Sequence, residues 1–244
     1  MSTRSVEQTP VPLRVSEPPT SSWRLLCRVA GIAALVSAAF IPVQIAVFLA
    51  VPPPLSGTST DWFALLRAHP VLGLVDLDLL LVADNVLLVP LLLALYVVLR
   101  RAHESATLLG AAAGLVGALL YIATNPAIQM SRLADRYYAA GAGQRGTIRA
   151  AGEAALASWQ GTGFHAAYLL GSLAGIVIGV VMLRTTPFSN LTGWMAIAAN
   201  AIGLGLYLPG FGVYISVFSV LFLEVWYLLV GVRLLGLART PKPA

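Results

Sequence analysis

The sequence predicts an all-α integral membrane protein, a bundle of six transmembrane helices with a helical connection between the third and the fourth. Of its 244 residues, 58% are hydrophobic and only 10% are charged, whereas a soluble domain carries about 25% charged residues. The mean hydropathy of +0.84 agrees with this composition. Apolar runs of about 18 residues or more recur, and each can cross a hydrocarbon layer about 30 Å thick as a helix.

The chain is expected to have one membrane domain between two short tails. Residues 1–21 are rich in Pro, Ser and Thr and carry too little apolar material to offset the entropy lost on ordering. We therefore predict a disordered cytoplasmic tail at 1–21, a membrane domain at 22–238 and a second cytoplasmic tail at 239–244. The first apolar run is long and begins only after the tail, which favours a retained span over a cleaved signal peptide.

Six spans account for the apolar runs. The polar joints between most of them are short, and only helices satisfy their own backbone polar groups in lipid with so little sequence. We expect the spans at residues 29–51, 71–99, 106–125, 161–183, 190–208 and 213–236.

The connection between the third and fourth spans, residues 126–160, is longer and more polar than the others. Apolar residues recur in it at helical spacing, and two short amphipathic helices broken near Gly141 fit the pattern. We interpret it as a helical connection lying at the membrane interface, with a lid over a cavity as the alternative. Its charged residues are Arg132, Asp135, Arg136, Arg145, Arg149 and Glu153.

The basic residues predict the orientation in the membrane. If both termini lie on one side, ten of the 15 Lys and Arg residues fall on that side and five on the other. The positive-inside rule then places both termini in the cytoplasm and the protein in the cell membrane. Because the basic residues flank apolar spans, the net charge of +5 does not indicate a nucleic-acid partner. The expected partner is the lipid bilayer.

Glycine stripes predict where helices pack closely. In lipid, small residues let helix backbones approach one another and so mark the contact faces. Gly171, Gly175 and Gly179 form one stripe on the fourth span, and Gly110 and Gly114 lie on the third. We favour packing within one chain over contact between copies in a homo-oligomer.

Polar side chains of three spans are expected to share the depth of the bilayer midplane. They are Asp84, Asn85, Asn200 and Glu224, with Asp78 and His165 as secondary candidates. No Lys or Arg lies mid-span to neutralise the midplane carboxylates, and a bare one costs at least about 2.5–3.5 kcal/mol. Each carboxyl should therefore be protonated, hydrogen-bonded, or in contact with a water-filled cavity or a cation. We expect the helices that carry Asp84 and Glu224 to pack face to face.

Two functions follow from this cluster: a small-solute carrier coupled to protons or cations, or a non-transporting structural or regulatory membrane protein. An enzyme is less favoured because HExxH and GxSxG motifs and a phosphate loop are missing. His69, Asp76 and His165 could supply three zinc ligands, but His165 at the entrance of a span is more typical of an interfacial hydrogen bond. No metal or cofactor is predicted, and the single cysteine, Cys27, cannot form an intrachain disulfide.

Two stretches resemble the DUF4386 family of bacterial and archaeal membrane proteins. The excess of Arg over Lys also hints at a GC-rich bacterial genome. The stretch 69–101 is similar to an early hairpin of the family, and the run 150–237 to its later part. The resemblance implies a multi-pass membrane protein of unknown function and supplies no catalytic residues. The similar features of the later run are Glu153 leading to Gly161-Thr162, the turn from Arg184 to Ser189 and the end from Phe222 to Leu235.

Overall fold

The computed structural model describes residues 23–239, and this part of the chain is helical and holds no strand. The predicted tails lie outside the described residues, apart from Arg239 at the end of the last helix. The helices are α1 (Arg24–Ala50), α2 (Ser59–Ala68), α3 (Pro70–Asp76), α4 (Leu79–Leu99), α5 (Glu104–Thr124), α6 (Ala127–Ala139), α7 (Ala142–Trp159), α8 (Thr162–Met182), α9 (Asn190–Gly203), the 3₁₀ helix η2 (Leu204–Tyr207) and α10 (Gly212–Arg239).

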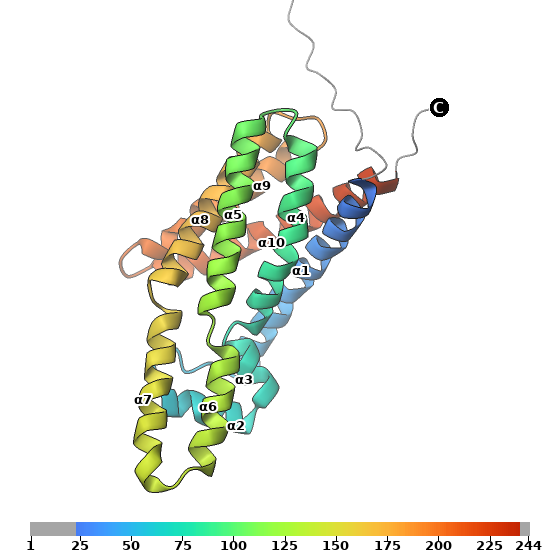
Figure 1. Ribbon diagram of the computed structural model, residues 1–244. Coiled ribbons are helices and arrows are strands. Elements are labelled where there is room, and N and C mark those ends of the chain that lie inside the picture. Colours follow the sequence, from blue (N-terminus) through green and yellow to red (C-terminus); the bar gives the residue numbers. More distant parts are fainter. Residues whose placement is uncertain (1–22, 240–244) are drawn as a thin grey trace, which may run out of the picture.

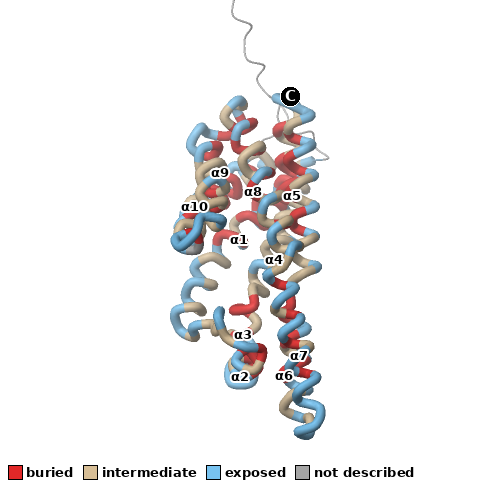
Figure 2. Tube along the Cα trace, turned by 90° about the vertical axis from the view of Figure 1, so that its left-hand side faces the viewer, coloured by how far each residue is buried: buried red, intermediate tan, exposed pale blue. Residues whose placement is uncertain are grey.

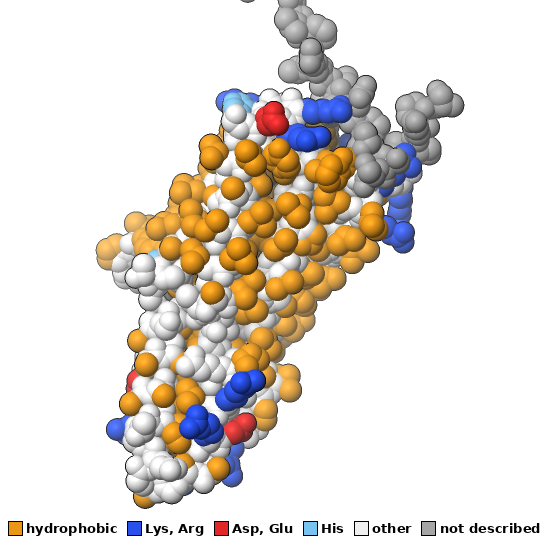
Figure 3. Space-filling model, in the orientation of Figure 1, with side chains coloured by type: hydrophobic (Ala, Val, Ile, Leu, Met, Phe, Trp, Pro, Cys, Tyr) orange, Lys and Arg blue, Asp and Glu red, His pale blue; other side chains and the backbone are white. Residues whose placement is uncertain are grey.

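Several of these helices have the length and composition of membrane spans. On the face shown in Figure 3, hydrophobic side chains form a broad band, and the charged side chains gather towards its two ends. The described part of the chain has five helical segments that are long and apolar enough to cross a membrane. They are Arg24–Ala50, Leu79–Leu99, Glu104–Ala139, Ala142–Met182 and Tyr214–Arg239.

Six helices form a closed ring in the membrane part of the molecule. Going round the ring, α1 packs on α4, α4 on α5, α5 on α8, α8 on α9, α9 on α10, and α10 back on α1. Small or apolar side chains fill the ring, among them Ala34, Leu95, Ile178, Ala196 and Val230. Neighbours in the ring therefore follow the chain, apart from the contact that closes it.

The predicted fifth span differs from the structure. Helix α9 has 14 residues, so it is about 21 Å long, which is short of a hydrocarbon layer of about 30 Å. The chain then tightens into the 3₁₀ helix η2 and turns at Pro209 and Gly210, where Gly210 has a φ of +80°. Glycines at 203 and 205 weaken the helix before this turn. Residues 190–208 are thus helical in two pieces, and only the other five predicted spans correspond to segments of spanning length.

The predicted second span is also broken. A single helix was expected over 71–99, but α3 ends at Asp76 and α4 starts at Leu79. Between them, Asp78 has a φ of 62°, in the left-handed region, and is the residue at the N-cap position of α4, where its side chain makes no capping hydrogen bond. Asp is one of the few residues other than Gly that enters this region with little strain, because its short polar side chain bonds locally. The break therefore follows from the two acids at the start of the apolar run.

The connection 126–160 forms a helical hairpin of α6 and α7, separated at Ala140 and Gly141. Figure 1 shows α6 continuing the direction of α5, and α7 leading into α8. The hairpin thus extends beyond the ring in the direction of α5 and α8. The expected connection at the interface would instead run across the end of the bundle. A second apolar core, with Trp62, Phe63 and Trp159 among its members, joins the hairpin to α2 and α3. In Figure 2, buried stretches of α2, α3, α6 and α7 lie below the helices of the ring. We refer to α2, α3, α6 and α7 as the cap.

Helix α2 had no counterpart among the predicted elements. Its N-terminus is held against α7, because the Ser59 N–H donates to Glu153 Oε1 at 2.7 Å and the Ser59 hydroxyl donates to the Arg149 carbonyl at 3.1 Å. Thr58 and Asp61 complete a capping box at the same end. These contacts satisfy backbone donors that every helix start leaves free. They fix α2 on α7 within the cap.

Candidate functional site

Asp84 lies in the ring on α4 and is hydrogen-bonded to two other helices. The Tyr227 hydroxyl of α10 donates to Asp84 Oδ2 at 3.0 Å. Ser37 of α1 supplies a second side-chain hydrogen bond to the same carboxyl. Tyr227 and Ser37 are both buried. The other carboxyl oxygen, Asp84 Oδ1, is buried too but has no hydrogen-bond partner among the described residues. The carboxyl is therefore held in place by two hydroxyls and keeps one oxygen free to bind a proton or another group.

Asp78 lies at the break between α3 and α4, just outside the spanning segment. The Tyr121 hydroxyl of α5 donates to Asp78 Oδ2 at 3.0 Å, and Trp159 of α7 adds a further side-chain hydrogen bond. The Asn125 amide donates to the Leu77 carbonyl at 2.9 Å and so fixes the backbone of the break. Burial raises the pKa of Asp78 from 3.8 to about 6, against the lowering effect of its two hydrogen bonds.

Tyr121 connects the two carboxyls electrostatically. Its hydroxyl is bonded to Asp78, and the charges of both Asp78 and Asp84 act on it. Six residues separate Asp78 from Asp84 along the chain, a rise of about 9 Å on a helix. Asp78 with Tyr121 and Asp84 with Tyr227 are thus two hydrogen-bonded pairs, one next to the cap and one inside the ring, and we call the four residues together the carboxyl–tyrosine path.

Asp76 lies beside this path at the end of α3. Its side chain is 0% exposed, and neither carboxyl oxygen has a hydrogen-bond partner among the described residues. Burial raises the pKa of Asp76 to about 6 from its ordinary 3.8. The neighbouring Gln44 of α1 donates to the Val75 carbonyl at 3.0 Å, and its own Oε1 is buried without a partner.

The raised pKa of Asp76 predicts a pH-dependent stability. Because the folded pKa is above the ordinary value, the folded state keeps a proton that the unfolded state has lost between about pH 4 and 6. This group therefore lowers the stability as the pH rises through that range. In a buffer without metal salts, we expect Asp76→Asn to raise the unfolding midpoint more at pH 8 than at pH 5, measured by tryptophan fluorescence in detergent. An equal change at both pH values would contradict the prediction.

The four predicted midplane residues are not hydrogen-bonded to one another. Asn85 donates to the Leu81 carbonyl and Asn200 to the Ala196 carbonyl, both at 2.8 Å and both within their own helix. Glu224 is half-buried and has no hydrogen-bond or ion-pair partner among the residues that the structure describes. Of the four, only Asp84 is bonded to another helix.

The helices α4 and α10 do not pack face to face as predicted. In the ring, α1 lies between them, and the hydrogen bond from Tyr227 to Asp84 reaches past it. The hydroxyls of Ser37, Tyr121 and Tyr227 are not among the predicted site residues, because a hydroxyl in an apolar span stands out less than a carboxyl or an amide. Tyr227 lies three residues after Glu224 on the same helix, and this spacing is the one signal that could have drawn attention to it.

His165 belongs to a separate polar group at the start of α8. Its Nδ1 lies 3.3 Å from the Tyr207 hydroxyl. Nearby, the Tyr168 hydroxyl donates to the Gly203 carbonyl at 2.7 Å and shares a hydrogen bond with Ser216. In residues 23–239, no three His, Cys, Asp or Glu side chains are grouped so that they could hold a metal ion. The exposed His69 at the start of α3 is not part of such a group.

Four of the five predicted packing glycines lie at contacts between helices. A Cβ at Gly110 or Gly114 of α5 would come within 3.2 Å of Ile178 or 2.8 Å of Leu92. At Gly175 of α8 it would lie 2.1 Å from the Asn200 amide nitrogen, and at Gly179 it would lie 2.9 Å from the Gly193 carbonyl oxygen. At Gly171, in contrast, a Cβ would meet nothing within 4 Å.

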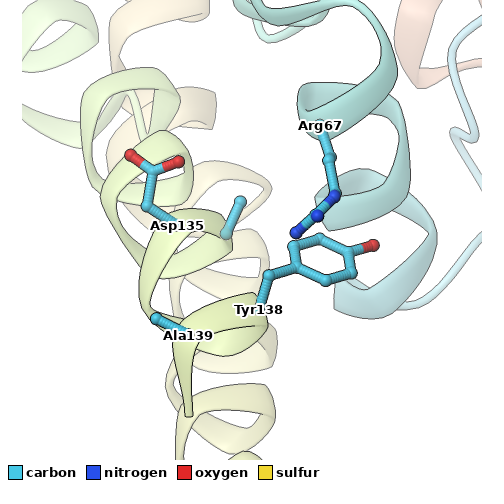
Figure 4. Close-up of a pocket in the computed structure, with 5 residues that line it drawn as sticks. Arg67, Asp135, Tyr138 and Ala139 are labelled. Atoms are coloured by element: carbon cyan, nitrogen blue, oxygen red, sulfur yellow. The ribbon is translucent and has the colours of Figure 1, made fainter.

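A surface hollow of about 280 Å³ lies between α2 and α6 of the cap. Arg67 lies over the ring of Tyr138, with 4.2 Å from the guanidinium carbon to the ring centroid (Figure 4). Asp135 and two alanines complete the lining. Its residues hold α2 on α6, and the hollow is open and apart from the carboxyl–tyrosine path.

No family model, no curated protein and no solved structure matches this chain.

Proposed function

We propose that this chain is a small-solute carrier coupled to protons or cations, and that Asp84 is its coupling residue. The observation that carries the proposal is the state of this carboxyl, which two hydroxyls orient and which keeps one buried oxygen free. Ionisable side chains inside spans are costly, and their usual functions are proton relay and ion binding. A purely structural acid would be expected to use both oxygens in hydrogen bonds.

The carboxyl–tyrosine path supplies a route for the proton. In the proposed route a proton passes from Asp78 to the Tyr121 hydroxyl, because a phenol both donates and accepts hydrogen bonds, and water carries it over the remaining distance to Asp84. Tyr121 is bonded to Asp78, and the charge of Asp84 also acts on it. Protonation of Asp84 at its free oxygen would then neutralise a carboxylate that is bonded to both α1 and α10.

The carrier is tested by proton flux in proteoliposomes. The purified full-length chain is reconstituted with a pH-sensitive dye inside, and a potassium gradient with valinomycin drives protons inward. We expect acidification above that of empty liposomes, and a solute screen then looks for compounds that increase it. If flux equals that of empty liposomes with and without solutes, the non-transporting structural or regulatory protein becomes the better proposal. Asn85 and Asn200 bond to carbonyls of their own helices and so offer no ligand to a solute, which favours the non-transporting protein.

We further propose that the chain belongs to the DUF4386 family that the sequence resembles, and that it crosses the cell membrane six times with both termini in the cytoplasm. The ring of six helices supports this number if α9 and η2 together make one thin crossing. The helix ends next to the chain termini carry more of the basic residues than the cap, in keeping with the positive-inside rule.

Single cysteines in a Cys27→Ser background test this orientation. We expect Arg145→Cys, in the cap, to react with an impermeant maleimide in intact cells. His103→Cys and Thr185→Cys should react only after the membrane is permeabilised. All three positions are in connections or next to them, so access depends on the side of the membrane and not on burial in the ring. The reverse labelling pattern would overturn the proposed topology.

A further inference from the structure

The end of α3 gathers buried oxygen atoms that have no donor. Both carboxyl oxygens of Asp76 and Oε1 of Gln44 are buried without a hydrogen-bond partner. The Gln44 amide nitrogen is bonded to the carbonyl of Val75, the residue before Asp76. The end of the Gln44 side chain therefore lies next to the start of the Asp76 side chain. Buried polar atoms in proteins are nearly always satisfied, and an unsatisfied group of this kind calls for a water molecule or an ion.

The helix break gives these oxygens the setting of a cation site. The chain leaves the helical path between Asp76 and Leu79, and α3 ends with its negative dipole end at Asp76. Broken helices in membrane proteins use such carboxyl-terminal ends and unwound carbonyls to coordinate Na⁺ or protons. A carboxylate at the negative end of a helix is further disfavoured unless positive charge is added beside it.

The charged and titratable groups around Asp76 leave its charge uncompensated. From α4, Asp78 adds a second carboxyl, and the charge of Asp76 acts on it. Tyr121 of α5 and Trp159 of α7 bond to Asp78, and α1 contributes the neutral Gln44. No Lys or Arg forms an ion pair with Asp76 within residues 23–239. The described residues therefore supply no positive charge to Asp76.

We propose that the carboxyl of Asp76 and Oε1 of Gln44 bind a monovalent cation of the size of Na⁺. A single carboxylate with neutral oxygens balances one positive charge, whereas Ca²⁺ takes six to eight oxygen ligands and usually more than one carboxylate. The described residues hold no group of three acidic or other metal-binding side chains that would favour a divalent ion. The site uses other residues than the proton path to Asp84, so it does not depend on the proposed carrier function.

Cation-dependent unfolding of the full-length protein in detergent tests the site. NaCl is varied at pH 8, and choline chloride keeps the ionic strength constant. We expect the unfolding midpoint to rise with the logarithm of the Na⁺ concentration once this exceeds Kd, by about 3–6 °C at a tenfold excess over Kd. The apparent Kd should be about tenfold weaker at pH 5, because a proton competes for the carboxylate. An equal effect of NaCl and choline chloride would overturn the proposal.

Variants identify the ligands. Asp76→Asn should remove the response to Na⁺ while its midpoint in choline chloride is at least that of the original chain, since a buried charge is gone. Gln44→Leu, which keeps the carboxylate, should weaken the apparent Kd at least about tenfold, as expected for one lost oxygen ligand. The exposed acid Asp135 provides the matched control, and Asp135→Asn should respond as the original chain does. A full Na⁺ response in Asp76→Asn, or in Gln44→Leu if the first variant does not fold, would refute the site.

Discussion

Asp84→Asn is expected to abolish proton flux in proteoliposomes, to below about one hundredth of the original rate, while the protein remains folded. The amide is the same size as the carboxyl and still accepts the hydrogen bond that Tyr227 donates at 3.0 Å, but it cannot bind and release a proton near neutral pH. Tyr227→Phe should have a smaller effect, about a tenfold loss, because removing one net hydrogen bond changes a free energy by about 1–1.5 kcal/mol. Ser37 keeps its own bond to the carboxyl in that variant.

Glu224→Gln is the matched control for this experiment. Glu224 lies on the same helix as Tyr227, three residues earlier, and has no bonded partner among the described side chains. Its replacement should leave the flux within about twofold, since it takes no part in the carboxyl–tyrosine path. Equal losses in Asp84→Asn and Glu224→Gln would argue for a general effect of charge in the spans. Unchanged flux in Asp84→Asn would remove it from the proton route.

Gly231→Leu is expected to lower the free energy of unfolding by about 3 kcal/mol, the upper end of the usual range for overpacking. This glycine lies where α10 crosses α1, and a Cβ there would lie 2.9 Å from Leu35 and 3.1 Å from the Gly31 carbonyl oxygen. The reciprocal Cβ at Gly31 would lie 3.0 Å from the Gly231 carbonyl oxygen. Because backbone atoms block both sides, the two helices must separate, and the contact that closes the ring is lost. Titration with SDS, followed by tryptophan fluorescence, measures the change.

Gly171→Leu serves as the control for the glycine experiment. Both changes put a leucine in place of a glycine within a spanning helix, but a Cβ at Gly171 meets nothing within 4 Å. We expect a change of less than about 0.5 kcal/mol, since leucine also favours the helix over glycine. The prediction for the α1–α10 crossing fails if both variants unfold at the same SDS concentration.

Local sequence information was sufficient for the class of the protein and for the ends of most helices. Apolar runs longer than a bilayer is thick can hardly be anything but spans, so the starts and ends of α1, α5, α8 and α10 agree with the predicted ranges to within five residues. The break between α6 and α7 is marked by Gly141 in the same local way. The shortening of α9 and the split of α3 from α4 were missed, because hydropathy averages over a window and does not report a backbone turn at one residue such as Asp78.

The candidate site depended on both levels. Asp84 stands out in the sequence by itself, because a carboxyl in an apolar run needs a partner wherever the run is folded. Its partners Tyr227 and Ser37 could not be chosen from the sequence, since spans are equally apolar on most sides and the order of helices round the ring is a property of packing. The same packing leaves Asn85 and Asn200 to bond to carbonyls one turn back in their own helices, which removes them from the predicted cluster. That Asp76 is buried without a donor is likewise decided by tertiary structure, because burial depends on α1 and the cap closing over the end of α3.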